Sequence, residues 1–313
     1  MLVCAVALAC AVPQGEKGSW HSPLGRDDPL VGRVYDPAAD AFIDRDAAFA
    51  RARLADWVLL GEKHDNADHH QLQADVIQSL ARDGLQPAVA FEMLSDDDRP
   101  KLEVWHESSP ESVSALGAAL DWKDSGWPDF EIYRPVFLAA ISRQLRIEPA
   151  NLSKAQLAAL HGGLDALPAA RRHELGLDVP LPPAARASLA DEIREGHCGM
   201  ANDALVASMV DVQRARDASL ADALVRAGVP AVLIAGAGHV RNDRGVPLYL
   251  AHRAPGRRVL SLAFVEVGPA SADLHKFASE YDLVWFTPRV DDQDPCERFK
   301  DQLDKLHQKS PGV

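Results

Sequence analysis

Two short motifs in the sequence place a histidine three residues after a glycine, Gly61–His64 and Gly236–His239. Each motif follows an apolar run typical of a buried strand, Trp57–Leu60 for the first and Ala231–Ala235 for the second. Glycine lets the backbone turn sharply and approach a ligand closely. Two imidazoles meeting at one edge of a sheet could bind a divalent metal or act as general base and general acid.

Acidic side chains accompany these histidines. Glu62 lies inside the first motif, and Glu92 follows another apolar run, Ala88–Phe91. In an open parallel sheet the ligand crevice lies beyond the carboxyl ends of the strands, where these groups would meet. We therefore predict a catalytic group of Glu62, Glu92, His64 and His239. If a metal is bound, its expected ligands are His64, His239 and Glu92.

Each of these residues also has an ordinary structural interpretation. A histidine just after a strand is often only a hydrogen-bonded turn residue. Glu92 could cap the helix that begins at Ser95–Asp98, and Asn66 is expected to cap the helix after the first motif. His69 and His70 are left as supporting or surface residues. Charged groups directly after buried strands in both halves of the chain nevertheless favour a site.

The order of apolar runs predicts an α/β fold. Strand, helix and strand follow one another between residues 57 and 91, which is a βαβ unit and implies a parallel sheet. Further short strands are expected at 145–147, 231–235, 259–267 and 283–286, with a hairpin at 31–43. The expected architecture is a parallel β-sheet core flanked by helices, with an inserted smaller all-helical domain.

These patterns divide the chain into five segments. They are a lipoprotein-type signal and tether (1–30), the first half of the α/β core (31–152), the helical insertion (153–226), the second half of the core (227–290) and a polar tail (291–313). The insertion is rich in alanine and leucine and is interrupted by prolines, which favours helices over strands.

The N-terminus indicates export. Ala7-Leu8-Ala9-Cys10 resembles a bacterial lipobox, in which Cys10 would receive the lipid. One acylated cysteine would hold the protein at a membrane surface, here the periplasmic side of a bacterial outer membrane, without a spanning helix. No basic segment precedes the apolar run, so a frayed apolar end without function is the alternative.

Composition excludes some partners. The net charge of −13 argues against nucleic acid, because phosphate binding requires a basic patch. Besides the two cysteines of the N-terminal run, the chain contains Cys198 and Cys296. They could pair in an oxidising compartment, but such wide spacing proves nothing, and we expect free thiols.

Taken in order, these motifs resemble the haem-binding uptake/Tiki superfamily, and within it the ChaN-like lipoproteins of bacterial haem and iron uptake. The matching stretches are Leu59–His64, Phe91–Glu92, Gly126–Pro128, Tyr133–Pro135, Pro149–Asn151, His197–Gly199, Gln213–Asp217 and Gly236–His239. The resemblance runs from about residue 32 to residue 267, which is most of the chain.

The resemblance implies haem binding through a tyrosine at a dimer interface, so a homodimer is expected. Tyr133 is the expected ligand, because aromatic residues surround it in sequence, and Arg134 could pair with a haem propionate. Packing between core and insertion is the alternative for Tyr133. Other residues expected at the cofactor are Asn151, His197, Gln213, Arg216 and Asp217, although the ordinary role of the last two would be a salt bridge.

Relatives in the wider superfamily use paired Gly-x-x-His motifs and a glutamate for metal-dependent peptide cleavage, or a similar site for ester hydrolysis. The sequence therefore leaves two functions open: haem binding for iron uptake, and hydrolysis with a divalent metal or a directly activated water. No Gly-x-Ser-x-Gly elbow is present, which argues against the usual serine hydrolases. A scaffold protein without a site is disfavoured, because both histidines and both glutamates are present.

Overall fold

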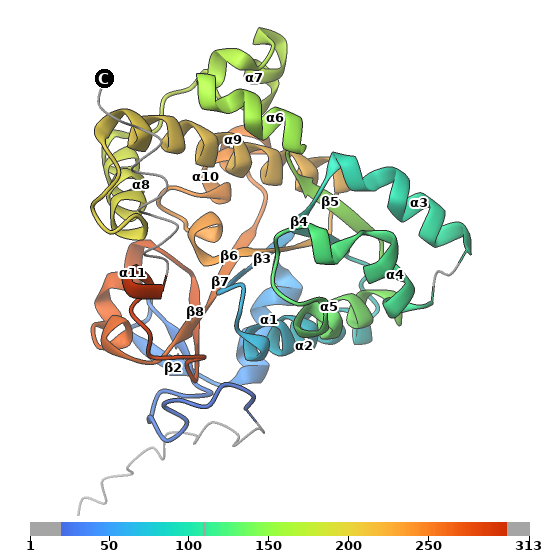
Figure 1. Cartoon of the computed structure of the whole chain (residues 1–313). Helices are drawn as coiled ribbons and strands as arrows, with labels where there is room; N and C mark the ends of the chain where they lie inside the picture. The colour runs from blue at the N-terminus through green and yellow to red at the C-terminus, as the bar shows by residue number, and fades with distance from the viewer. Residues whose placement is uncertain (1–19, 109–110, 299–313) are drawn as a thin grey trace, which may run out of the picture.

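The computed structural model describes residues 20–108 and 111–298 (Figure 1). At its centre is a mostly parallel sheet of eight strands in the order β2-β1-β8-β7-β3-β6-β4-β5. The strands are β1 (Val34–Asp36), β2 (Ala41–Ile43), β3 (Trp57–Glu62), β4 (Ala88–Ser95), β5 (Ile147–Asn151), β6 (Ala231–Gly236), β7 (Val259–Glu266) and β8 (Leu283–Thr287). Strand β1 is antiparallel to β2 and β8, and the other pairs are parallel. The predicted α/β fold is confirmed.

The central strands are buried on both faces, which explains their continuous apolar runs. In β3, Val58 and Leu60 belong to one core cluster, whereas Trp57 and Leu59 belong to the other. Successive side chains of a strand point to opposite faces, so a sheet covered on both sides requires apolar residues at every position.

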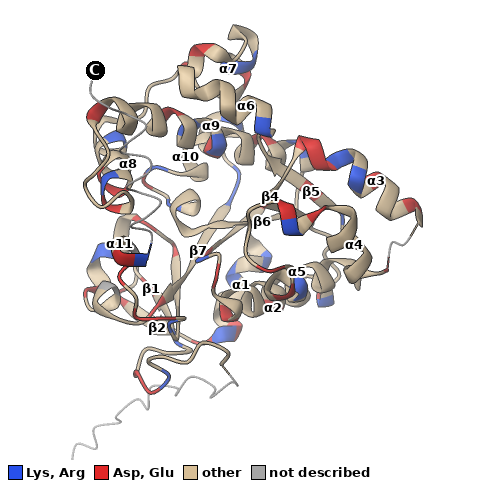
Figure 2. Ribbon diagram, in the orientation of Figure 1, with Lys and Arg blue, Asp and Glu red and all other residues tan. Residues whose placement is uncertain are grey.

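Helices cover both faces of the sheet (Figure 1). They are α1 (Arg45–Leu54), α2 (Ala67–Arg82), α3 (Arg99–Ser108), α4 (Val113–Ala119), α5 (Phe130–Ile141), α6 (Lys154–Ala159), α7 (Ala169–Leu175), α8 (Pro183–Gly196), α9 (Asp203–Ala227), α10 (Val246–Arg253) and α11 (Pro295–Arg298). Helices α1, α2 and α5 contribute to one core layer, and α9 and α10 to the other. Acidic and basic residues are interspersed along these elements (Figure 2).

Short 3₁₀ turns complete the connections. They are η1 (Asp96–Asp98), η2 (Trp122–Asp124), η3 (Leu160–Gly162), η4 (Leu164–Ala166), η5 (Ala237–Val240), η6 (Pro269–Ser271) and η7 (Leu274–Ser279). The predicted cap of α2 is confirmed, because Asn66 accepts the backbone N–H groups of Asp68 and His69. Helix α1 is capped by Asp44, which accepts the backbone N–H of Ala47.

The helical segment expected at 153–226 contains α6 to α9. Helices α8 and α9 share a small apolar cluster of their own, formed by Leu189, Ile193, Val206 and Val210. Beyond it, the second half of α9 packs against the sheet, where Ala215 and its neighbours enter the main core. Helix α9 therefore carries α8 and fixes it above the carboxyl ends of the strands.

Part of the segment expected to be a loose tether is packed against the core. The backbone N–H groups of His21 and Ser22 donate to the Asp68 carboxylate at 2.7 and 2.8 Å. Leu24 forms an isolated bridge with Arg289. The predicted lipid site Cys10 lies outside the described residues. Within those residues, none of the helices has the length and apolar character needed to cross a membrane.

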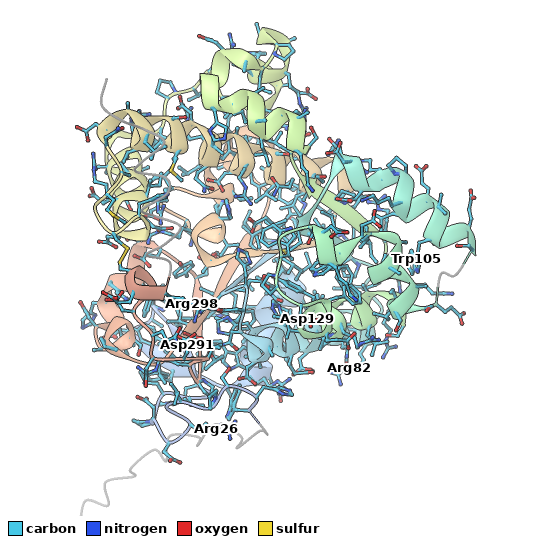
Figure 3. All side chains as sticks on the ribbon, in the orientation of Figure 1. Arg26, Arg82, Trp105, Asp129, Asp291 and Arg298 are labelled. Atoms are coloured by element: carbon cyan, nitrogen blue, oxygen red, sulfur yellow. A yellow bond between two sulfur atoms is a disulfide. The ribbon has the colours of Figure 1, made fainter. Side chains whose placement is uncertain are left out.

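The expectation of free thiols is wrong, because Cys198 and Cys296 form a disulfide. The bond joins the turn after α8 to α11, elements that lie close together in Figures 1 and 3. The cysteines are 98 residues apart in sequence, so only the fold brings them together. The disulfide attaches the end of α8 to the C-terminal part of the described chain.

We expect the double substitution Cys198→Ser and Cys296→Ser to lower the free energy of unfolding by about 2–5 kcal/mol, because the cross-link restricts a long loop in the unfolded chain. Urea unfolding with and without a thiol reductant measures the change. Reductant should destabilise the wild type and leave the double variant unaffected. A wild type insensitive to reductant under unfolding conditions would contradict the cross-link.

Candidate functional site

Three neighbouring strands carry the predicted groups to one edge of the sheet. Strand β6 lies between β3 and β4, and all three are parallel. Glu62, the last residue of β3, is paired in register with Gly236 at the end of β6. Glu92 lies in the second half of β4, His64 follows β3, and His239 lies in η5 directly after β6. The two motifs therefore meet because their strands are adjacent.

The glycines of the motifs are required by close contacts. A Cβ atom at Gly61 would lie 2.4 Å from Val240 Cγ2 and 2.9 Å from Ala237 Cα, so a side chain here would displace η5. A Cβ atom at Gly236 would lie 3.1 Å from Nε2 of His64. The imidazole of the first motif therefore rests against the glycine of the second, and the motifs form one site.

Glu62 is a buried carboxylate with both oxygens engaged. Its Oε1 accepts the Tyr133 hydroxyl at 2.8 Å and lies 2.9 Å from Nδ1 of His64. Its Oε2 accepts Nε2 of Gln73 at 2.7 Å and lies 3.0 Å from Nδ1 of His70. Because Glu62 holds Nδ1 of His64, the other ring nitrogen of that histidine is the one available to a ligand.

The charges of this cluster reinforce one another. Burial alone would raise the pKa of Glu62, but His70 and His64 hold it well below its usual range. Burial alone would lower the pKa of His64, whereas Glu62 and Glu92 together raise it above its ordinary value. Glu62 is therefore an anion that orients and polarises the His64 imidazole.

The second histidine is held by two carboxylates. Nδ1 of His239 lies 2.6 Å from Asp217 Oδ1, and its Nε2 lies 3.3 Å from Glu92 Oε1. Glu92 also binds the Arg216 guanidinium and accepts the backbone N–H of Gly236 at 2.8 Å. Burial alone would lower the pKa of His239, but Glu92 and Asp217 raise it to about 9. His239 is therefore an imidazolium at neutral pH.

A cleft of about 440 Å³ opens between this edge of the sheet and α8. The side chain of His64 is 35% exposed and reaches the cleft. The apolar lining comes mainly from the helical segment, through Leu189, Ile193 and Met209. A second hollow of about 680 Å³ lies beside β4 and β5 and includes Trp127, whose ring meets His64 edge-on with centroids 4.9 Å apart.

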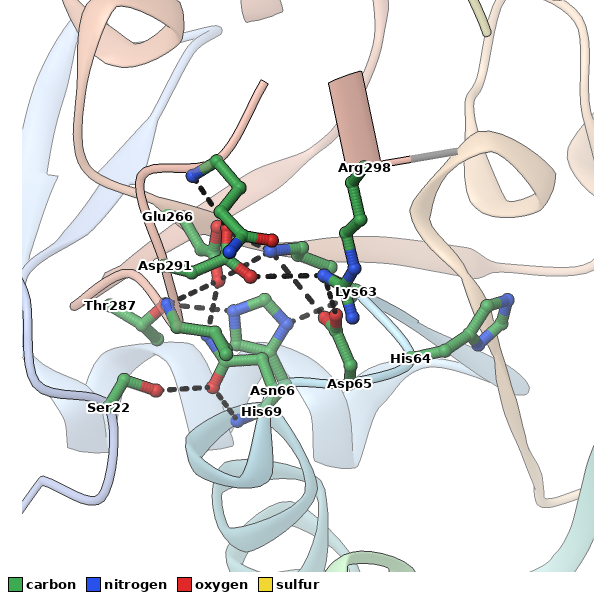
Figure 4. A network of polar contacts seen from close by, with 12 residues as sticks. Ser22, Lys63, His64, Asp65, Asn66, His69, Glu266, Thr287, Asp291 and Arg298 are labelled. Carbon is green, nitrogen blue, oxygen red and sulfur yellow. Dashed lines mark hydrogen bonds and ion pairs between the residues drawn. The ribbon is translucent and has the colours of Figure 1, made fainter. Parts of the chain in front are cut away.

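A polar network fixes the turn of the first motif from behind (Figure 4). Lys63 Nζ lies 3.0 Å from Glu266 Oε2, and the side chain of Asn66 donates to Glu266 Oε1 at 2.9 Å. Nδ1 of the buried His69 accepts the backbone N–H of Lys63 at 2.9 Å, and burial lowers the pKa of His69 to about 3. In Figure 4 the side chain of His64 points away from this network. The network therefore supports the turn and leaves the imidazole accessible.

Most predicted site residues lie in or beside the cleft. Those that line it are Glu62, His64, His197, Gln213, Asp217 and His239. Arg216 and Glu92 line the neighbouring hollow, as does Asn151, which donates to the main-chain oxygen of Glu92 at 2.9 Å. Glu92 is buried within β4, so it does not cap the helix after it. The roles of these residues in ligand binding stay predictions.

Tyr133 and Arg134 lie elsewhere. The Tyr133 side chain is 0% exposed, its hydroxyl is bound to Glu62, and its ring packs tilted against His70 with centroids 4.0 Å apart. Burial and the Glu62 charge raise the pKa of Tyr133. Arg134 is exposed on α5 and paired with Glu131. Neither side chain lines the cleft, and the roles of Tyr133 and Arg134 at a cofactor stay predictions.

Two residues of the site, Gln73 and Arg244, were not predicted. Gln73 holds Glu62 from the buried face of α2, together with His70, which the sequence left as a supporting or surface residue. The spacing of three residues between His70 and Gln73 on an amphipathic helix next to the first motif is a signal that could have identified Gln73. Arg244 lines the cleft from the loop before α10, and its position in a polar turn sequence gives no such signal.

The donor arrangement does not fit a divalent metal. Among the described residues, no group of three or more His, Cys, Asp or Glu side chains is placed to hold one. Glu92 is engaged by Arg216 and the backbone N–H of Gly236. Both ring nitrogens of His239 lie against carboxylates, Nδ1 against Asp217 and Nε2 against Glu92, so neither residue presents a free ligand atom beside His64. The predicted site of His64, His239 and Glu92 is therefore not supported.

The fold and the site define an α/β protein with two histidine–carboxylate pairs at the carboxyl edge of a mostly parallel sheet. The chain belongs to the family described as haem-binding uptake, Tiki superfamily, ChaN, whose model matches residues 48–250. The resemblance inferred from the motifs is confirmed. No curated protein matches the sequence.

A solved structure supports this fold. ChaN of Campylobacter jejuni, described with cofacial haem binding, is similar with a TM-score of 0.68 and 23% identity, covering 80% of this chain and 95% of that one. The type III effector HopBA1 has a TM-score of 0.44 and 16% identity, over 78% and 93% of the two chains. An erythromycin esterase mutant in its open conformation has a TM-score of 0.44 and 14% identity, over 79% and 95%.

The raised pKa of His239 predicts a loss of stability at alkaline pH. Its value of about 9 in the folded protein compares with about 6.5 in an unfolded chain. The folded state therefore binds the proton more tightly, and this contribution is complete below about pH 6.5 and lost as the pH rises through 9. Thermal unfolding between pH 6 and 9.5 should show a falling midpoint, with a shallower slope for His239→Gln. Equal slopes for the two proteins would contradict this prediction.

Proposed function

We propose that this protein binds haem in the cleft, with His64 facing the iron. The observation that carries the proposal is the state of the His64 imidazole: Nδ1 is held 2.9 Å from the buried Glu62 carboxylate, and the side chain is partly exposed in the cleft. Metal-binding histidines commonly have their second ring nitrogen fixed by a carboxylate in this way. Membership of the haem-binding uptake family supports the proposal.

The residues around His64 fit a porphyrin. Leu189, Ile193 and Met209 give the cleft an apolar wall, and Lys63 and Arg244 are cations in its lining that suit propionates. When bound, the iron would supply an open coordination position for an imidazole nitrogen. The chain itself contributes the orientation of that imidazole and the exclusion of water by α8.

Tyr133 is a weaker candidate for the ligand than His64. Its oxygen donates to Glu62 within the core, and α5 would have to move before that oxygen reached either hollow. We assign Tyr133 the role of positioning Glu62, and through it His64. The tyrosine ligand and the homodimer implied by the family resemblance therefore stay expectations.

The cellular part of the proposal is a lipoprotein, anchored through Cys10 at the periplasmic side of a bacterial outer membrane and serving haem or iron uptake. The disulfide between Cys198 and Cys296 supports export, because such bonds persist in oxidising compartments and are rare in the cytosol. Family membership supports the uptake role.

A haemin titration of the purified full-length protein, followed by absorption, tests the proposal. We expect saturable binding by the wild type. For His64→Ala we expect an affinity lower by a factor of about ten or more, with a changed spectrum. Tyr133→Phe should retain saturable binding, and His173→Ala, which alters an exposed histidine on α7, is the matched control. Absence of saturable binding by the wild type would overturn the proposal, and loss only in Tyr133→Phe would reassign the ligand.

The second candidate function is ester or peptide hydrolysis without a metal. It is favoured by the two imidazole–carboxylate pairs, Glu62–His64 and Asp217–His239, on either side of Gly236. His64 would take the proton of an attacking water, and the His239 imidazolium would give one to the leaving group.

Under this second function, hydrolysis of a panel of nitrophenyl esters should persist in a metal chelator. It should fall by a factor of about 10² or more in His64→Ala, because that substitution removes the general base. The His173→Ala variant should retain the wild-type rate. Activity abolished by chelation would instead indicate a metal enzyme. If no activity above background is found, haem binding remains as the proposed function and hydrolysis is rejected.

A further inference from the structure

Arg244 is a buried cation at the wall of the cleft. It lies in the loop between η5 and α10, its side chain is 2% exposed, and it lines the same cleft as His64 and His239. A buried guanidinium is costly unless opposite charge and hydrogen bonds compensate for the lost water. The partners of Arg244 therefore indicate what the position is built to bind.

Those partners are few. Within the described residues, the carboxylate in ion-pair contact with Arg244 is Glu192 of α8, and that side chain is 53% exposed. The Nε atom of Arg244 is buried, and no described residue forms a hydrogen bond with it. The nearby Arg241 differs, because Asp243 and Glu280 both bind it. Among the arginines in the described part of the chain, Arg244 is the one that combines deep burial with a half-exposed counter-ion.

Glu192 occupies the cleft rather than the core. Its Oε1 would lie 3.0 Å from a Cβ atom at Gly238, so its carboxylate rests over the second Gly-x-x-His motif. Both Glu192 and Gly238 line the cleft together with Arg244. Because Glu192 extends from the solvent-facing side of α8, its side chain can turn into water and leave the guanidinium to another anion.

We propose that Arg244 is the recognition residue for a carboxylate of the ligand. In the free protein Glu192 is a displaceable counter-ion that occupies the position of this carboxylate. A guanidinium binds a carboxylate through two parallel hydrogen bonds, which fixes the orientation of the ligand as well as its charge. The inference rests on the proposed haem function, in which the carboxylate is a propionate.

Haemin and its dimethyl ester are the probes that test this role, because esterification removes the propionate charge and keeps the iron and the ring. Titrations are followed by absorption for the full-length wild type, Arg244→Gln, Glu192→Gln and Arg53→Gln. The last variant changes an exposed arginine of α1 outside the cleft and serves as the matched control. Thermal midpoints check that each variant is folded.

We expect the wild type to bind haemin more tightly than the diester. Arg244→Gln should weaken haemin binding about ten- to hundredfold with little effect on the diester, the size expected for a hydrogen bond between charged groups. Glu192→Gln should tighten haemin binding and leave the diester unchanged, because the competing carboxylate is removed. Arg53→Gln should match the wild type for both probes.

The outcomes separate this inference from the haem function. A wild type that binds haemin and the diester equally, or a Glu192→Gln variant with no gain for haemin, would overturn the role of Arg244 and leave haem binding intact. If Arg244→Gln does not fold, the wild-type and Glu192→Gln comparisons still decide the matter. A wild type that binds neither probe would overturn both proposals.

Discussion

The burial of the Glu62 carboxylate is the constraint on which the site depends. An ionised carboxylate in a protein interior is strongly unfavourable unless charges and hydrogen bonds replace its hydration. Here the replacements come from three separate elements: the turn after β3 provides His64, α2 provides His70 and Gln73, and α5 provides Tyr133. Removing one partner would leave an incompletely compensated charge, so the position of His64 is coupled to the packing of both helices on the sheet.

The same edge of the sheet is completed by an element from another part of the chain. Helix α8 forms the opposite wall of the cleft, and it reaches that place through its own small apolar cluster with α9 and through the disulfide to α11. The floor of the cleft is thus set by strand adjacency, whereas its wall is set by helix packing and a cross-link. The two can vary independently, which is how one family fold can present different ligand surfaces above similar strand ends.

Much of the fold and part of the site could be predicted from the sequence. Apolar runs marked the strands because both faces of the sheet are buried, and Asn66 marked the start of α2 through its capping chemistry. The convergence of His64 and His239 followed from the rule that parallel strands end at a common edge.

Other features depended on long-range packing. Nothing in the sequence around Cys198 and Cys296 indicates that residues 98 positions apart will touch. The inward position of Tyr133 did have a local signal, since Val136, Phe137 and Ala140 share its face of α5 and are also buried. Arg134, one residue along, points to solvent for the same geometric reason. The family resemblance favoured the tyrosine as a ligand, which stays a prediction, whereas helical periodicity indicates its buried position.

The charges of the site explain how an acidic protein can accept an anionic ligand. The buried carboxylates of Glu62, Glu92 and Asp217 are each engaged by a histidine or an arginine. The His64 imidazole reaches the cleft, and the Arg244 guanidinium would become accessible to a ligand once Glu192 is displaced, as proposed above. The net charge of −13 acts mainly at long range, where salt screens it beyond about 8 Å at physiological ionic strength. Inside the cleft the nearby cations act at contact distance, so local donors determine which ligand is bound.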